Sequence, residues 1–213
     1  MVKLAKKSWT TAAELTKQLE ADPKFVARRE QRERERQARS ARIFAEAAPL
    51  LAELQAAGLQ IQFVSDLISR SERYTAAIPI LLKHLLMPYS DVLKETIARS
   101  LAVPEPEVRK AWPILVAEYI KAPSGLGMKA PGDTEAFKLS AKDGIAVALS
   151  VAVTETTMEE LISLAKDRKH GESRILLLSA LKKSKSTAAE NAIKQLASDP
   201  DLMKEISSWR KRK

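Results

Sequence analysis

Residues 78–86 read IPILLKHLL and residues 112–120 read WPILVAEYI, two stretches built on one pattern. In the first stretch, apolar side chains recur at the spacing of one helix face, at Ile78, Leu81, Leu82 and Leu85. This spacing predicts an amphipathic α-helix. Each stretch has a proline as its second residue, and a proline does least harm in the first turn of a helix. The two stretches are therefore predicted to be the first helices of a repeated unit.

Second helices repeat in the same register. The stretches LKETIARSLAV (93–103), AKDGIAVALSV (141–151) and SRILLLSALKK (173–183) align through Ile97, Ile145 and Leu177. The first helices continue with MEELISLAK at 158–166. The step from the first unit to the last is the same for the first helices, 78 to 158, as for the second helices, 93 to 173. Helix pairs thus recur in one register, with extra residues in the middle unit, which is the signature of an α-solenoid.

The repeats resemble the HEAT-repeat family of armadillo-like α-solenoids. The resemblance covers about residues 45–206 and rests on an acidic turn residue, Asp91, a second-helix start, Leu93-Lys94-Glu95-Thr96-Ile97, and first-helix prolines at Pro49, Pro79 and Pro113. It implies an all-α fold, a right-handed solenoid of about four HEAT-like helical pairs. HGESRILLLSALKKSK (170–185), taken with ADPKFVARRE (21–30), is similar to bacterial HEAT-repeat proteins of unassigned function.

The excess positive charge lies at the two ends of the chain. The chain has 213 residues and a net charge of +9. Residues 28–42 contribute +4 and residues 210–213 another +4, whereas residues 43–209 carry a net charge of −1. A dedicated DNA-binding domain normally shows a basic face in its body, so this distribution weakens a nucleic-acid role. We divide the chain into an N-terminal helical extension (1–44), a repeat domain (45–209) and a basic tail (210–213).

Composition narrows the class of protein further. The chain has no cysteine, which excludes disulfides and thiolate metal sites and fits a reducing, cytoplasmic compartment. The longest nearly unbroken apolar run, at 145–153, is too short to span a bilayer, and the N-terminus does not read as a secretory signal. We expect no membrane association, cofactor or metal.

The stretch RREQRERERQARSAR at 28–42 holds seven arginines and three glutamates. Asp22-Pro23 predicts the start of its helix and Gly58 the end, while Ser8 or Thr10 is expected to cap a shorter helix before it. Glutamates and arginines four positions apart, such as Glu30 and Arg34, support a solvated helix. The alternative is an arm that contacts a partner or a nucleic acid, with Arg32 and Arg36 as candidate residues. Interleaved glutamates argue against strong phosphate binding.

A basic residue recurs at the start of three second helices, at Lys94, Lys142 and Arg174. In solenoids the second helices commonly line the concave face, so these residues, with Glu95 and Arg99, are candidate partner-binding residues. The alternative is that they pair with acids of the turns, Asp91 and Asp143, and stabilise the stack.

Two further features are candidate sites. His170 begins the turn HGES, which is typical of the start of a helix; the alternative is a corner that faces a ligand. Neither His170 nor His84 stands at a spacing typical of metal ligands. The glycine-rich insert at about 123–140 predicts a long loop, either functional or disordered, and it holds no phosphate-binding pattern.

The sequence favours a non-enzymatic interaction module, an adaptor, scaffold or complex subunit that binds a protein partner through the solenoid surface. It holds no catalytic motif. The alternative is a nucleic-acid-associated HEAT protein, similar to the alkylpurine glycosylases built on this architecture. The basic ends and the recurring basic residues motivate that alternative, and the neutral body argues against it.

Overall fold

The structure is a computed structural model that describes residues 11–124 and 140–210. These residues form α-helices and short 3-10 helices, with no strand among them. The all-α fold class is thereby confirmed. The α-helices are α1 (Ala12–Glu20), α2 (Pro23–Ala56), α3 (Ala77–Leu85), α4 (Asp91–Ser100), α5 (Pro106–Lys110), α6 (Trp112–Lys121), α7 (Ala141–Ala152), α8 (Met158–Lys166), α9 (Arg174–Lys183), α10 (Thr187–Leu196) and α11 (Met203–Arg210). The 3-10 helices are η1 (Val64–Leu67), η2 (Glu155–Thr157) and η3 (Arg168–Ser173).

The start and end of α2 follow the predicted signals. Asp22 caps the helix by accepting a hydrogen bond from the backbone N–H of Lys24 at 2.9 Å, and Pro23 occupies the first helical position. The helix ends at Ala56, shortly before Gly58, whose φ of 90° favours glycine. The cap of α1 differs from the prediction: it is Thr11, which forms a capping box with Glu14, rather than Ser8 or Thr10.

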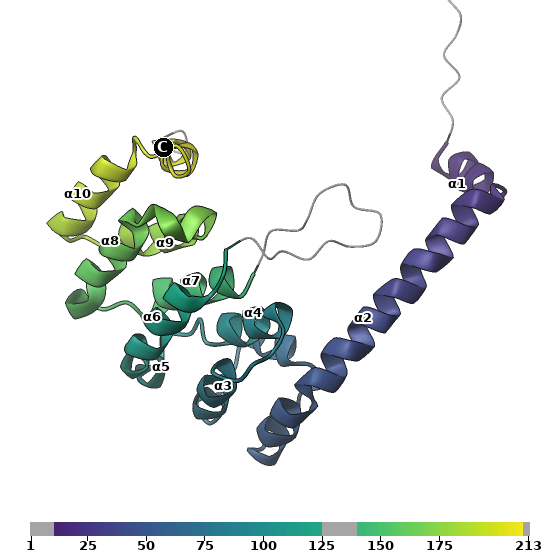
Figure 1. Ribbon diagram of the computed structural model, residues 1–213, viewed down its shortest axis with the longest axis horizontal. Helices are drawn as coiled ribbons and strands as arrows, with labels where there is room; N and C mark the ends of the chain where they lie inside the picture. The colour runs from purple at the N-terminus through teal and green to yellow at the C-terminus, as the bar shows by residue number, and fades with distance from the viewer. Residues whose placement is uncertain (1–10, 125–139, 211–213) are drawn as a thin grey trace, which may run out of the picture.

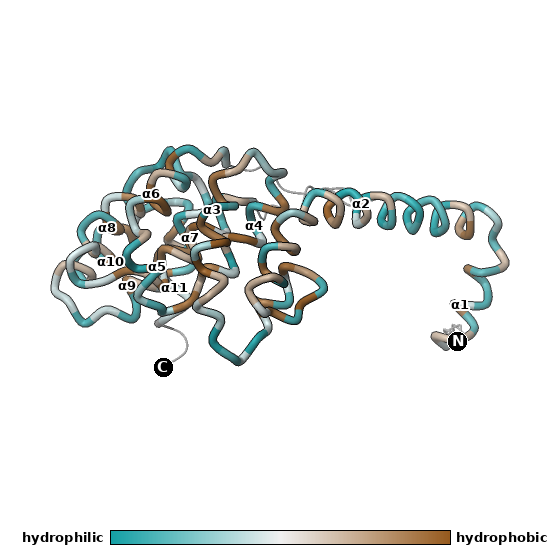
Figure 2. Tube along the Cα trace, turned by 90° about the horizontal axis from the view of Figure 1, so that it is seen from below, coloured by the Kyte–Doolittle hydropathy of each residue, from teal (hydrophilic) through white to brown (hydrophobic). Residues whose placement is uncertain are grey.

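The helix α2 belongs to the body of the protein only over its last turns. Its buried residues are Ala47, Leu50, Leu51 and Leu54, which share one face, and none of its residues before Ala47 is buried. The remainder extends away from the other helices as a hydrophilic rod with α1 at its tip (Figure 2). We call residues 23–43 of α2 the arm. The predicted boundary at 44/45 lies inside this continuous helix, close to the residue at which burial begins.

The body is built from helices that pack in chain order. The second helices α4, α7 and α9 contact one another in turn, while α3, α6 and α8 pack beside them (Figure 1). The α4 and α7 helices approach each other closely: a Cβ added to Gly144 would lie 2.6 Å from the carbonyl oxygen of Glu95 and 3.1 Å from Cβ of Ala98. Glycine is therefore required at this crossing. The α7 helix is buried along most of its length.

The aligned prolines do not occupy equivalent positions. Pro113 is the second residue of α6 and Pro79 the third of α3, as expected for a first turn. Pro49 instead lies inside α2, which continues through it to Ala56. The predicted insert begins after α6 and ends before α7, but residues 125–139 lie outside the described residues, as do 211–213 of the basic tail. The handedness and the number of HEAT-like pairs stay predictions.

Candidate functional site

Lys142, one of the recurring basic residues, is buried at the start of α7. Its Nζ donates hydrogen bonds to the carbonyl oxygens of Tyr119 and Ala122, each at 2.8 Å, and lies 4.8 Å from the centre of the Tyr119 ring. Both carbonyls are at the C-terminal end of α6, where a cation complements the helix dipole. Burial lowers the pKa of Lys142 below its usual value. The residue thus ties the two helices of its pair together.

Arg174 performs the same role one unit later. Its Nη1 donates to the carbonyl of Ala165 in the last turn of α8 at 3.3 Å, and its Nε donates to the carbonyl of Gly171 at 2.9 Å. The guanidinium also binds two carboxylates beyond α10, those of Asp199 and Asp201. The side chain of Arg174 is fully buried. Hydrogen bonds from Arg174 lower the pKa of Asp199 to about 2.

These positions do not support Lys142 and Arg174 as residues that bind a partner. Both are inside the protein and both bind carbonyl groups at the end of the preceding first helix. The expected stabilising role agrees with this arrangement, but the expected partners are wrong. Asp91 accepts from the backbone N–H of Ala141 at 3.2 Å, and Asp143 caps the start of α7. At Lys142 and Arg174 the recurring basic residue therefore occupies a structural position between the two helices of its pair.

The candidates on α4 lie nearer to the surface. Lys94 is half-buried, with its Nζ 3.3 Å from a carboxylate oxygen of Glu118 on α6. Glu95 and Arg99 form an ion pair with each other along the helix, and both are partly exposed. They are accessible to a partner only in part, because each already has an ionic partner within the chain.

His170 belongs to a buried cluster rather than to an open corner. Its ring centre is 4.6 Å from that of Tyr119, and burial lowers its pKa. The Oγ of Ser173 donates to the carbonyl of His170 at 2.7 Å, so it accepts the hydrogen bond from the hydroxyl of Tyr119, 2.9 Å away. Burial raises the pKa of Tyr119 to about 12. This cluster supports the interpretation of HGES as a helix entry.

His84 is also buried, and it joins α3 to its neighbours. Its Nδ1 is 2.8 Å from the hydroxyl of Tyr89, and its Nε2 lies 3.3 Å from a carboxylate oxygen of Glu53 on α2. The rings of His84 and Tyr89 are stacked, with centres 5.8 Å apart. Within the described residues, no group of three or more histidine, cysteine, aspartate and glutamate side chains is placed to hold a metal ion.

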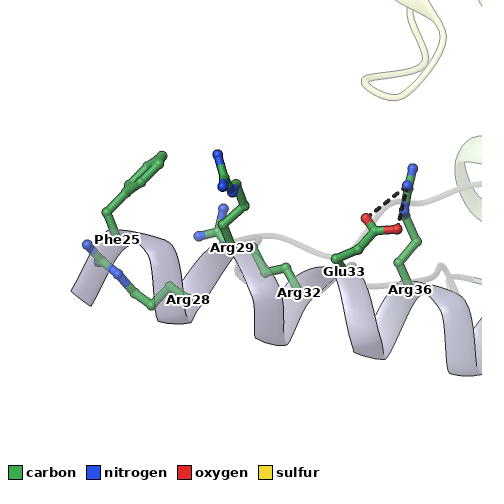
Figure 3. A pocket seen from close by; sticks show the side chains of 6 residues that line it. All are labelled: Phe25, Arg28, Arg29, Arg32, Glu33 and Arg36. Carbon is green, nitrogen blue, oxygen red and sulfur yellow. Dashed lines mark hydrogen bonds and ion pairs between the residues drawn. The ribbon is translucent and has the colours of Figure 1, made fainter. Parts of the chain in front are cut away.

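Arg32 and Arg36 lie on the exposed arm, among side chains that line a shallow hollow along α2 (Figure 3). The Nη2 of Arg36 is 2.8 Å from a carboxylate oxygen of Glu33, and Glu33 also accepts from Gln37 at 3.0 Å. Arg29 is 3.6 Å from Glu20 at the end of α1. These pairs differ from the predicted pair of Glu30 and Arg34. The arm is solvated, as expected.

Sequence order hides how the charges of the arm are arranged around the helix. Taking about 100° per residue, six of the seven arginines between 28 and 42 fall with Lys24 within about 140° of the circumference. We call this set, Lys24, Arg28, Arg29, Arg32, Arg36, Arg39 and Arg42, the arginine face. Arg34 lies outside it, as do Glu30 and Glu33, and Glu35 is the single acid within the arc. A helical projection of the sequence would have found this face.

Comparisons with known proteins do not identify the chain: no protein-family model, no curated protein and no solved structure matches it. No helix within residues 11–124 and 140–210 combines the length and the apolar character needed to cross a bilayer. Since Lys142, Arg174 and His170 are buried, the candidate surface is the exposed arm with its arginine face, together with the junction of the arm to the body.

Proposed function

We propose that this chain is a non-enzymatic interaction protein, an adaptor or complex subunit whose HEAT-like helical body binds a protein partner. Stacked helix pairs of this kind present extended surfaces suited to another macromolecule. We also propose a cytoplasmic location, which fits the cysteine-free composition.

An exposed aromatic pair at the junction of arm and body carries this proposal. Phe44 of α2 is 52% exposed and Phe63, in the loop before η1, is 53% exposed. Their rings contact each other edge to face, with centres 6.1 Å apart. Isolated exposed apolar residues are common, but two contacting aromatic rings form a larger apolar patch. Aromatic residues are the typical anchors of protein–protein interfaces.

The interior of the body supports a scaffold role. Its buried charged and polar groups, among them Lys142, Arg174 and Tyr119, form bonds between successive helices. Such cross-links fix the helices relative to one another, and a rigid surface loses less entropy when it binds. The junction patch is then presented in one orientation.

Site-specific photo-crosslinking in native cells tests this proposal. A benzophenone amino acid at position 63 should give a discrete adduct with one protein, and Phe44→Ser should abolish that adduct because it removes half of the patch. Position 86 supplies a matched control, because Leu86 is also 52% exposed but follows the end of α3. Equal adducts from positions 63 and 86, or none from position 63, would contradict the proposal.

A further inference from the structure

We propose that the arginine face of the arm binds the phosphate backbone of duplex DNA, independently of sequence. The site is separate from the aromatic patch at the junction. It is built from one side of one helix, and its chemistry is set by the guanidinium groups of Arg28, Arg29, Arg32 and Arg36 together with those of Arg39 and Arg42.

The charge on this face is nearly uniform. It carries seven basic side chains and one acidic side chain, Glu35, which accepts a hydrogen bond from Gln31 at 2.9 Å. The other two glutamates lie outside the arc, and Glu33 is already bound by Arg36 and Gln37. The interleaving of acids in the sequence therefore does not interleave them on the surface. This removes the main objection to phosphate binding by the stretch.

Three guanidinium groups on the face have no acidic partner in the part of the chain that the structure describes. Arg28, Arg32 and Arg42 are exposed, and among residues 11–124 and 140–210 no carboxylate lies within ion-pair distance of them. Arg28 donates only to the backbone carbonyl of Lys24, at 3.2 Å. An arginine guanidinium matches the geometry of a phosphate group and binds it through two N–H donors. These side chains are available for such contacts without breaking an existing pair.

The composition of the arm separates DNA from other anionic partners. No large apolar residue occurs between Val26 and Ile43, whereas a protein interface needs an apolar core and a membrane-bound helix needs an apolar face. Single-stranded nucleic acid is held largely by aromatic side chains that stack on successive bases, whereas the arm has a single aromatic residue, Phe25, at its N-terminal end. Interfaces with DNA are more polar and far more positively charged than those with proteins.

The shape of the arm favours duplex DNA over duplex RNA. A helix with its side chains is about 10–12 Å wide, which the major groove of B-DNA, about 12 Å wide, admits. The deep and narrow major groove of A-form RNA does not. From Lys24 to Arg42 the face extends for about 27 Å at about 1.5 Å per residue, or roughly eight base pairs of B-DNA at about 3.4 Å each. A helix this long makes several phosphate contacts along one groove.

Fluorescence anisotropy of the full chain with a labelled mixed-sequence duplex tests the proposal. Between about 50 and about 200 mM salt, we expect the logarithm of the binding constant to fall linearly with the logarithm of the salt concentration. The magnitude of this salt slope should be roughly 4, which corresponds to about four or five phosphate contacts at about 0.9 each. Arg32→Gln should lower the slope by about 1. Arg34→Gln removes the same charge from the opposite side of the helix and should leave the slope unchanged. Equal effects of these two substitutions, with helicity retained by circular dichroism, would overturn the proposal.

Two further variants test whether the arm or the basic tail binds the duplex. One competitor tests whether the arm's partner is DNA or an acidic protein. Arg28→Gln/Arg32→Gln/Arg36→Gln should weaken binding at least tenfold at the lower salt concentration, whereas deletion of residues 210–213 should leave most of it. The reverse pattern would assign binding to the basic tail and contradict the proposal. Polyglutamate at equal charge should compete poorly; displacement as effective as that by unlabelled duplex would indicate an acidic protein partner instead. Photo-crosslinking at position 63 is unaffected by these outcomes, so either proposal can fail alone.

Discussion

Arg174 and Asp199 form a two-point ion pair between segments far apart in sequence, with Nη1 3.0 Å from Oδ2 and Nη2 3.3 Å from Oδ1. Both side chains are buried. A planar guanidinium and a carboxylate in this geometry fix the relative orientation of the elements that carry them. The pair therefore attaches the loop after α10 to the start of α9.

Acid should destabilise the protein through this pair. Because Arg174 donates hydrogen bonds to it, Asp199 has a folded-state pKa of about 2, below its ordinary value of 3.8. A carboxyl group whose pKa is lowered on folding stabilises the protein above its unfolded pKa, and this contribution is lost as the pH falls through the folded pKa. The stabilisation amounts to about 2 kcal/mol. At pH 3, which lies between the folded and unfolded pKa values, about half of this stabilisation should be lost, about 1 kcal/mol. Urea unfolding at pH 7 and at pH 3 measures this loss.

Asp199→Asn is the matched variant for that experiment. It keeps the size of the side chain but removes the charge, so it should be less stable than the parent chain at neutral pH and should lose less stability between pH 7 and pH 3. A variant with the same loss of stability on acidification as the parent chain would show that Asp199 is not the group responsible.

Alkali should destabilise the protein through Tyr119. Burial raises the pKa of its hydroxyl to about 12 from 10.0, so the folded state favours the neutral form. The contribution of the neutral hydroxyl to the stability of the folded state is fully present below pH 10. As the pH rises towards 12, the free energy of unfolding should fall by about 2–3 kcal/mol. Tyr119→Phe should cost about 1 kcal/mol at pH 7, for the lost hydrogen bond to Ser173. Its unfolding free energy should fall less steeply than that of the parent between pH 9 and 11.

The parent and Tyr119→Phe chains must be compared directly, because the titration of Lys142 changes the stability in the opposite direction as the pH rises. Burial lowers the pKa of Lys142, so the folded state gains stability relative to the unfolded state as the pH rises through that lowered pKa towards 10.5. Both chains contain Lys142, and the difference between them isolates the tyrosine. Parallel curves for the two chains would contradict the prediction.

Gly144→Ala should destabilise the body although alanine favours helix by about 1 kcal/mol over glycine. The added methyl group would meet the backbone carbonyl of Glu95 at 2.6 Å, and backbone cannot move aside as a flexible side chain can. We expect a net loss of about 1–3 kcal/mol, measured by urea unfolding. An increase in stability would show that α4 and α7 can separate at little cost.

Removal of residues 1–42 should barely change the melting temperature of the body. None of the described residues before Ala47 is buried, so we expect a shift of less than about 3 °C. A chain that begins at residue 52 also loses the buried side chains of Ala47, Leu50 and Leu51 and should lose several kcal/mol, at about 1.5–3 kcal/mol per leucine. Similar losses in the two chains would show that the arm packs on the body.

The sequence predicts elements of this structure wherever the signal is local. Asp22, Pro23 and Gly58 predict both ends of α2, because capping and φ preference depend on neighbouring residues alone. The recurrence of Lys142 and Arg174 also predicts that they occupy equivalent positions.

Their burial was not predictable in the same way, because it depends on distant residues. Arg174 is held by Asp199 from beyond α10, and no spacing rule links the two positions. Pro49 shows the converse limit: it aligns with Pro79 in sequence, yet α2 continues through it, since the turns that follow Ile43 already pack on the body through Leu50 and Leu54.

Because the arm and the body share one helix, the number of residues between the arginine face and the buried residues of α2 fixes the direction in which the face points. Arg32 precedes the core residue Leu50 by about five whole helical turns, and Arg36 precedes Leu54 by the same interval. One alanine inserted between Phe44 and Ala45 would leave every charge in place but swing the arm's basic side about 100° around the axis. A single-residue insertion at an exposed position thus acts as a rotation of the whole arm.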